Sequence, residues 1–166
     1  MRFESLLASR APAATILIRL MVGGVFVSEG VQKFLFPAVR GAGRFERIGL
    51  PAAEFLGPFV GGAELLCGAL VLVGLLTRLA AIPLIVTMVV AIVTTKIPIL
   101  LGESYWGLTL RELSSYGFWS MAHESRTDFA MLLGSVFLFI VGAGPLALDA
   151  LWQRRREDGI REENGP

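Results

Sequence analysis

The residues that usually bind metals or carry redox chemistry are scarce in this sequence. Among 166 residues, Cys67 is the only cysteine and His123 the only histidine. One cysteine excludes an internal disulfide and a CxxC redox pair, and one histidine excludes an HExxH zinc motif. Glycine-rich phosphate loops and haem-attachment motifs are absent as well. We therefore expect no metal site, no covalently bound cofactor and no self-sufficient redox enzyme.

Charge is the second scarcity. Charged residues make up 17% of the chain and hydrophobic residues 54%, a balance too apolar for a soluble domain of this size. The formal net charge of +1 provides no field that would attract nucleic acid. These figures predict that the principal partner of the chain is a lipid bilayer.

Four apolar segments are long enough to cross that bilayer. They have 23 or 24 residues each and cover 13–35, 53–76, 79–101 and 129–151. At 1.5 Å per residue, each exceeds the roughly 30 Å hydrocarbon core. Much of their length lacks a polar face with a 3.6-residue period, as is typical of helices surrounded by lipid. The sequence predicts an all-α fold, a four-transmembrane-helix bundle in one domain, 1–152, followed by a charged tail, 153–166.

The connections between these segments predict how they pack. Almost nothing separates the second segment from the third, which favours an antiparallel hairpin. The longest connection, 102–127, contains aromatic residues that prefer headgroup level, so we expect short amphipathic helices there. Ser125 and Asp128 fit a capping box that would open the fourth helix. Small residues four apart would allow close helix packing or a homo-oligomer. They are Gly24, Ser28, Gly57 and Gly61.

Lysine and arginine divide evenly between the two sides of the membrane, so their number does not indicate the orientation of the chain. Their distance from the span ends does. Arg154, Arg155 and Arg156 directly follow the fourth segment, and Arg78 lies in the short turn on the same side. Basic residues close to span ends favour the cytoplasm. We therefore expect a multi-pass protein of a bacterial cytoplasmic (inner) membrane with both termini in the cytoplasm.

Ionisable residues inside the predicted spans are the sharpest functional signal. Arg19, Glu29 and Lys33 lie in the first, Glu64 in the second and Lys96 late in the third. Charges at that depth are costly and usually mark a function. Glu29 and Lys33 are spaced i, i+4 on one helix face. Glu64 has no charged neighbour three or four positions away, so it needs Arg19 or Lys33 as a partner, or a proton.

Each of these charges also has a plain structural interpretation. Glu29 and Lys33 can form a pair that neutralises itself while Lys33 reaches the nearby interface. Glu64 can belong to a structural inter-helix ion pair. In the functional interpretation, a buried carboxyl that shares a proton with a cation binds a quinone carbonyl or relays a proton.

A histidine and two acids follow the aromatic connection in MAHESRTD, 121–128. His123, Glu124 and Asp128 do not share one helix face, so a metal site is not expected. His123 can titrate near neutral pH at a membrane surface. We expect His123, Glu124 and Trp119 at the mouth of an intramembrane site, with His123 as a proton donor there.

The order of residues from Arg19 to Ala91 resembles the DoxX family of small four-helix integral membrane proteins. The resemblance is carried by RLMVGGVFVSEGVQKF at 19–34, FERIGLP at 45–51 and GGAELLCGALVLVGLLTRLAA at 61–81. Matching positions include Arg19, Lys33 and Glu64, whereas Glu29 stands where many relatives carry another residue, often histidine. The family is named after a membrane subunit of an archaeal thiosulfate:quinone oxidoreductase, and other relatives are linked to thiol and oxidative-stress complexes. The resemblance implies the membrane fold and an association with redox chemistry.

The leading hypothesis is a membrane component of an oxidoreductase system with a polar intramembrane site for a quinone or similar small amphiphile. A soluble redox protein or a second membrane subunit would be its partner. Glu64, Lys33 and His123 would be catalytic. The ligand would be bound by Arg19, Glu29, Lys96, Trp119 and Glu124. Two alternatives remain: a transporter for a small solute or ion that uses the same charges as a relay, and a non-catalytic scaffold that anchors a soluble redox partner.

Overall fold

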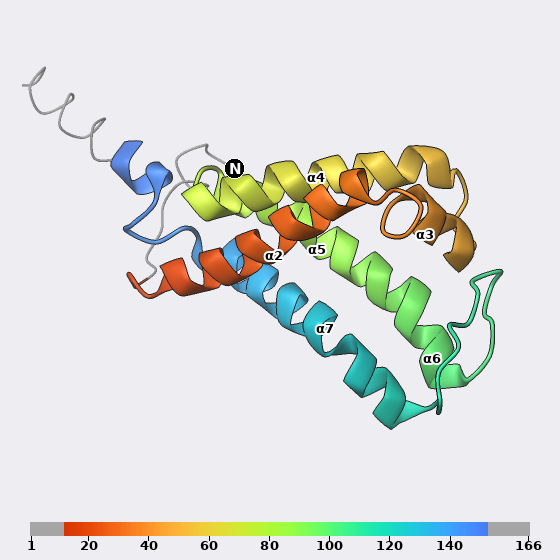
Figure 1. The fold of residues 1–166 in the computed structure, drawn as a ribbon. Helices are drawn as coiled ribbons and strands as arrows, with labels where there is room; N and C mark the ends of the chain where they lie inside the picture. Colours follow the sequence, from red (N-terminus) through yellow and green to blue (C-terminus); the bar gives the residue numbers. More distant parts are fainter. Residues whose placement is uncertain (1–11, 153–166) are drawn as a thin grey trace, which may run out of the picture.

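The computed structural model describes residues 12–152, and the regular structure in this part of the chain is helical. Two antiparallel hairpins make up the fold (Figure 1). The first hairpin contains α2, α3 and α4, and the second contains α5, η1, α6 and α7. The bounds are α2 Thr15–Leu35, α3 Ala42–Ile48, α4 Ala53–Val73, α5 Thr77–Ala91, the π-helix η1 Ile92–Lys96, α6 Ile97–Leu101 and α7 Phe118–Val141.

Three of the predicted spans are confirmed. Among the described residues, three helical stretches are long and apolar enough to cross a membrane: α2, α4 and the continuous stretch Thr77–Leu101. The short turn between α4 and α5 is also as expected, because Gly74 and Leu76 adopt left-handed conformations that reverse the chain within three residues. The prediction that the second and third spans, α4 and α5, follow one another through a tight turn is therefore correct.

The fourth predicted span, 129–151, is not one helix. The helix of this region, α7, begins at Phe118 and ends at Val141. Gly142 has φ 87° and ψ −167°, and Pro145 follows shortly, so the helix cannot continue. The first turns of α7 are polar, and only the stretch after Asp128 is continuously apolar. By length and composition, α7 does not qualify as a fourth transmembrane helix.

The expected short amphipathic helices of the third loop are not found. Residues 102–117 contain turns and one isolated bridge between Tyr105 and Leu108. Glycines with positive φ interrupt this segment, and the last of them, Gly117, is the N-cap of α7. Ser125 and Asp128 therefore lie inside α7, and the predicted capping box there is wrong. The predicted tail, 153–166, lies outside the described residues.

The hydrophobic core lies where all four long helices meet. Each helix contributes two buried residues, which are Val22 and Phe26, Cys67 and Val71, Ala80 and Leu84, Met131 and Leu138. α2 and α4 approach closely through glycines: a Cβ on Gly23 would lie 2.8 Å from the Gly68 carbonyl oxygen, and one on Gly30 would lie 2.7 Å from that of Gly61. Gly24 faces open space. The small-residue prediction therefore holds for Gly61, whereas the close contacts of α2 are at Gly23 and Gly30 and not at the predicted Gly24 and Ser28.

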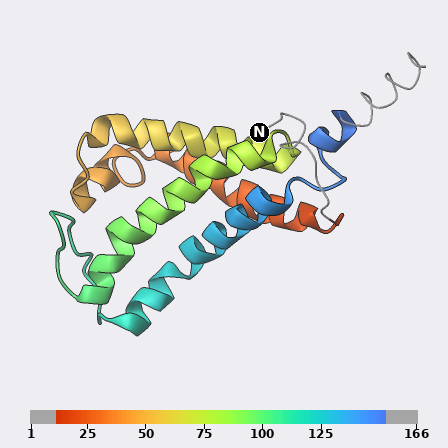
Figure 2. The same cartoon turned by 180° about the vertical axis from the view of Figure 1, so that it is seen from behind.

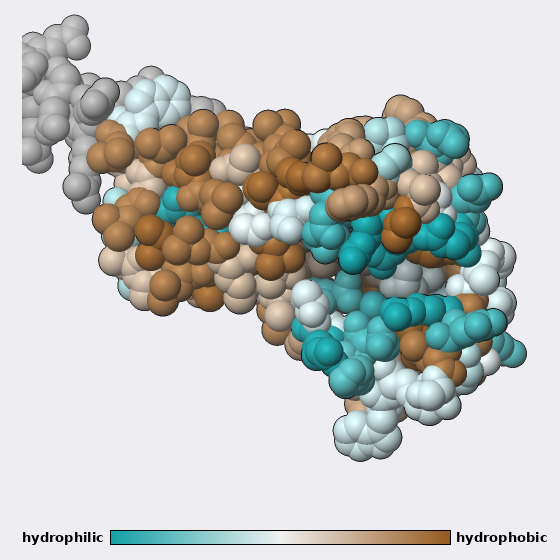
Figure 3. Space-filling view, in the orientation of Figure 1, coloured by the Kyte–Doolittle hydropathy of each residue, from teal (hydrophilic) through white to brown (hydrophobic). Residues whose placement is uncertain are grey.

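The two hairpins converge at one end of the molecule and diverge at the other (Figures 1 and 2). We call the converging end, formed by the start of α2, the α4–α5 turn and the end of α7, the closed end. The open end contains α3, the last turns of α2, the first turns of α4, α6, the 102–117 loop and the first turns of α7. Hydrophilic residues gather at the open end on both sides of an indentation, and apolar residues cover most of the remaining surface in this view (Figure 3).

Candidate functional site

Lys33 and Glu64 form a buried ion pair between α2 and α4. Lys33 is 7% exposed and Glu64 2%, and the Lys33 Nζ lies 2.6 Å from the Glu64 Oε2. The close crossing of Gly30 over Gly61 lies one turn from both residues and brings their helices together. Two charges in so apolar a setting are tolerated only when they are paired. Of the two partners expected for Glu64, the structure places Lys33 beside it.

Glu29 extends this pair towards the surface. Its Oε2 lies 3.7 Å from the Lys33 Nζ, and its side chain is 36% exposed. Within residues 12–152, the Lys33 ammonium is the one donor that reaches Glu64 Oε2. A buried carboxylate oxygen with spare accepting capacity can bind a ligand donor or a proton.

Arg44 is a fourth charge near this pair, and the sequence reasoning missed it. It lies on α3, and its charge interacts with that of Glu64. The first loop folds back over α2 and α4 because glycine permits contact: a Cβ on Gly57 would lie 2.5 Å from the Ala42 nitrogen. The sequence signal was the GAGRF stretch, whose small residues allow such docking. We call Glu29, Lys33, Arg44 and Glu64 the Glu64 cluster.

Arg19 lies at the closed end and does not contact Glu64. Its guanidinium donates to two last-turn carbonyls of α4 and to two carbonyls that follow α7, which adds donors where helix ends leave carbonyls short of them. The bonds are Nε to Val71 O (2.9 Å), Nη2 to Leu72 O (2.6 Å), Nη1 to Ala143 O (3.3 Å) and Nη1 to Leu146 O (2.6 Å). The Val71 carbonyl also accepts from the Gly74 N–H at 3.2 Å. This geometry favours a structural role, and a ligand-binding role for Arg19 stays a prediction.

Asp149 complements Arg19 at the same end. Its Oδ1 accepts from the Leu76 N–H at 2.9 Å and its Oδ2 from the Thr77 N–H at 3.4 Å, which caps the start of α5. Its own N–H donates to the Gly74 carbonyl at 3.0 Å. Burial raises the pKa of Asp149, while the two N–H donors and the charge of Arg19 oppose that rise. No local pattern in the sequence marked this residue, since its partners are more than 70 positions away.

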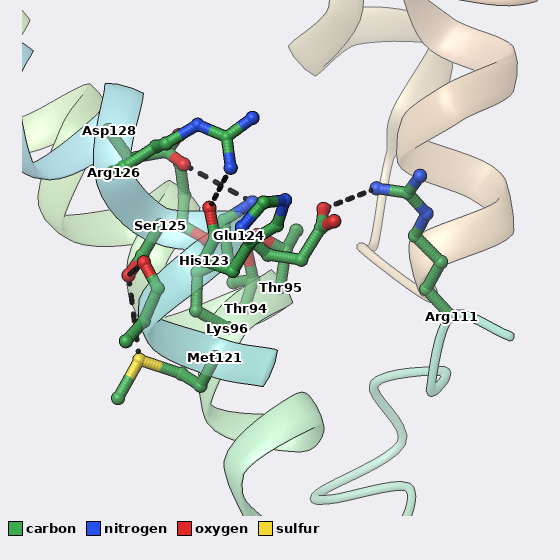
Figure 4. Close-up of polar contacts among 12 residues, drawn as sticks. Thr94, Thr95, Lys96, Arg111, Met121, His123, Glu124, Ser125, Arg126 and Asp128 are labelled. Carbon is green, nitrogen blue, oxygen red and sulfur yellow. Dashed lines mark hydrogen bonds and ion pairs between the residues drawn. The ribbon is translucent and has the colours of Figure 1, made fainter. Parts of the chain in front are cut away.

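Lys96 and Asp128 form a second ion pair, on the other hairpin. The Lys96 Nζ lies 3.2 Å from the Asp128 Oδ2 of α7, and Lys96 is buried (Figure 4). Lys96 ends the π-helix η1, two residues before Pro98. Proline has no N–H to donate to the carbonyl four positions earlier, and its ring clashes with that carbonyl. The wider π turn before Pro98 accommodates this break in the α-helical hydrogen bonding. The Lys96 prediction identified a buried charge, and its partner was not foreseen.

The residues expected at the mouth of the site lie on the first turns of α7. A shallow hollow of about 280 Å³ is lined there by Leu113, Ser114, Ser115, Trp119, Ser120, His123 and Glu124. Arg111 of the loop donates to Glu124 at 3.0 Å (Figure 4). The His123 ring is exposed and has no hydrogen bond to another described residue. Within residues 12–152, no three His, Cys, Asp or Glu side chains are placed to hold a metal ion.

Buried ion pairs within largely apolar long helices define a class: a helical membrane protein with polar groups inside its spans. The chain belongs to the DoxX family, whose family model matches residues 14–97. It is 50% identical over 150 residues to the "Uncharacterized membrane protein Rv3486" of Mycobacterium tuberculosis, a match that covers 90% of this chain and 88% of the relative. It is 29% identical over 146 residues to the "Putative oxidoreductase CatD" of Bacillus subtilis, covering 87% and 91%. No solved structure gives a significant match.

Proposed function

We propose that this protein is the membrane component of an oxidoreductase system, and that the Glu64 cluster binds the polar head of a quinone or similar small amphiphile. The observation that carries the proposal is the buried Lys33–Glu64 ion pair, which lies between two largely apolar helices with Glu29 beside it. Ionisable residues are costly inside membrane-spanning helices, and their presence there is a reason to propose a functional site.

The position of the cluster supports a ligand that enters from the bilayer. The cluster lies where the last turn of α2, α3 and α4 pack together. The open end, to which the last turn of α2 and α3 belong, has hydrophilic surface on both sides of an indentation and apolar helix faces beside it (Figure 3). An amphiphile can place its head among the charges and leave its tail against those faces. If both termini are cytoplasmic, the open end faces the outer side of the membrane.

Electrons for such a reaction would come from a partner. Cys67, the only cysteine, is buried in the core, and one thiol cannot form an internal redox pair. A soluble redox protein or a second membrane subunit would supply the missing centre. The Bacillus subtilis relative carries the name "Putative oxidoreductase CatD", which supports a redox role.

The packing of the closed end supports a ligand-binding function for this protein over a transport function. There the four helices pack around a shared core, and Arg19 and Asp149 tie the helix ends together. A transporter would need a path through this end. Proton-driven solute flux in liposomes that contain this protein alone would contradict the binding proposal.

The test is a ligand census on protein purified in mild detergent, by native mass spectrometry and organic extraction. Wild type, Glu64→Gln and Lys33→Met are compared with Glu54→Gln, which removes an exposed acid from the first turn of the same helix. All four must elute as folded, monodisperse protein. Wild type and the Glu54 variant should retain a quinone-class molecule that the other two lose.

Two results would overturn the proposal. Normal retention by Glu64→Gln removes the central role of that carboxyl. Copurification of a soluble partner without any small molecule favours the scaffold, and the buried charges are then structural.

A further inference from the structure

Arg44 is the member of the Glu64 cluster whose donors are unused. Its side chain is partly buried, yet the guanidinium makes no hydrogen bond or ion pair with any residue in 12–152. Its backbone N–H donates to the Gly41 carbonyl at 3.0 Å, and its side-chain charge lies within electrostatic range of Glu64. An arginine carries five N–H donors, and leaving them unmatched in a partly apolar setting is unfavourable.

Arg47, on the same helix, is an arginine with a structural role. Its Nη1 donates to the Ala38 carbonyl at 2.8 Å and its Nη2 to the Val39 carbonyl at 3.0 Å, which fixes the preceding loop. The two arginines are three positions apart in α3. Of the two guanidinium groups, that of Arg47 is the one that donates hydrogen bonds within residues 12–152.

The backbone holds Arg44 in place. A Cβ on Gly41 would lie 2.7 Å from the Lys33 carbonyl oxygen, and Gly57 leaves similarly little room beside Ala42. α3 is therefore packed against the end of α2 and the start of α4, beside the buried ion pair. The position of Arg44 is a property of the fold and does not depend on a free loop.

Arg44 is the cation of the cluster that has no carboxylate at ion-pair distance among residues 12–152. Lys33 already lies between the carboxylates of Glu64 and Glu29, at 2.6 and 3.7 Å. The guanidinium fork matches the paired oxygens of an oxyanion better than an ammonium does. We infer that Arg44 is a ligand-binding residue of this site and selects amphiphiles whose polar head carries a negatively charged oxygen. The inference rests on the proposed function and narrows its ligand class.

The experiment uses two ring-matched probes, hydroxynaphthoquinone, which is ionised at neutral pH, and its neutral methyl ether. Dissociation constants are measured by calorimetry for the full chain in nanodiscs of zwitterionic lipid. The proteins are wild type, Arg44→Gln, Arg47→Gln and Glu64→Gln, each checked for Tm. Wild type should bind the ionised probe about 10-fold more tightly than the ether. Arg44→Gln should lose this preference, and Arg47→Gln should keep it.

The outcomes separate the inference from the function beneath it. If Glu64→Gln loses both probes while Arg44→Gln keeps the wild-type preference, the inference is overturned and the proposed function stands. If wild type binds neither probe, both are overturned. In a further set of measurements, the nanodiscs contain the anionic lipid phosphatidylglycerol, whose phosphate could bind Arg44 in place of the probe. If it weakens binding of the ionised probe to wild type and leaves Arg44→Gln unchanged, a lipid phosphate occupies Arg44 and the assignment to the ligand is wrong.

Discussion

At the closed end, Arg19 and Asp149 bond to backbone groups, whereas at the open end Lys33 and Glu64 pair with each other. The Arg19 guanidinium makes four hydrogen bonds to carbonyl oxygens, and Asp149 accepts from two backbone N–H groups. In the Glu64 cluster, in contrast, side-chain charges pair with one another, and the Arg44 guanidinium has no hydrogen-bond partner within residues 12–152. A charge inside an apolar protein is therefore not evidence of function by itself. The partners of its atoms distinguish a structural charge from a candidate site.

The largest expected effect comes from Arg19→Met. This change removes the side-chain donor of the Leu72, Ala143 and Leu146 carbonyls, at about 1–3 kcal/mol for each buried group, while Val71 O keeps the Gly74 N–H. We expect a loss of at least about 4 kcal/mol, or failure to accumulate as folded protein. Thermal unfolding followed by size-exclusion chromatography measures it. Arg40→Met, at an exposed position, is the control and should behave as wild type. Equal stability of the Arg19 variant would refute its structural role.

Lys33→Met should destabilise the protein more than Glu64→Gln. Removing the lysine leaves a 2%-exposed Glu64 without its ion-pair partner, whereas removing the Glu64 charge leaves Lys33 with Glu29 at 3.7 Å. Breaking one side of a buried pair costs about 3 kcal/mol, and we expect that figure for Lys33→Met only. The double variant Lys33→Met/Glu64→Gln should recover part of the loss. Chemical denaturation in detergent would decide, and the reverse order of the two single variants would contradict this description of the cluster.

Gly30→Ala and Gly24→Ala test the helix crossing that positions the pair. At Gly30 the added methyl would lie 2.7 Å from the backbone of α4, so the two helices must separate, at about 1–3 kcal/mol. At Gly24 nothing lies within 4 Å, and the better helix propensity of alanine should leave stability unchanged or raise it by up to about 1 kcal/mol. Tm values of the two variants provide the comparison. Similar values would show that the crossing is looser than described.

The smallest effect concerns Asp149, whose pKa is raised by burial. A carboxyl whose pKa is higher in the folded than in the unfolded state stabilises the fold when protonated. That contribution is present below the unfolded value and is lost as the pH rises through the folded value. The stability of wild type relative to Asp149→Asn should therefore fall as the pH is raised from about 4. Tm measured from acid to neutral pH tests this, and a pH-independent difference would show that the hydrogen bonds and Arg19 outweigh burial.

The sequence predicted those features that depend on a single segment. The length and apolarity of 13–35, 53–76 and 79–101 are local properties, and these spans agree with the structure. The failed prediction, 129–151, joined two apolar runs across Gly142 and Pro145. Those residues end a helix for local reasons, so the error could have been avoided from the sequence.

The arrangement of the charges could be predicted only in part, because it depends on how two helices cross. Lys33 meets Glu64 since Gly30 and Gly61 let α2 and α4 approach with this register, and no single segment contains that information. Arg44 lies in a loop whose docking becomes apparent only in three dimensions. The expected pairing of Lys33 with Glu64 therefore agrees with the structure, Arg44 was missed, and the functional role of these residues stays a prediction.

The four bonds of Arg19 also impose an order of events during synthesis. Two of its acceptors, the carbonyls of Ala143 and Leu146, lie 124 and 127 residues downstream. When the first helix leaves the ribosome and enters the membrane, these acceptors do not yet exist, and part of the guanidinium must remain bonded to water or lipid. The first helix can reach its final environment only after α7 has been made. A chain that stops before Ala143 lacks two of the four hydrogen bonds by which Arg19 joins the helix ends.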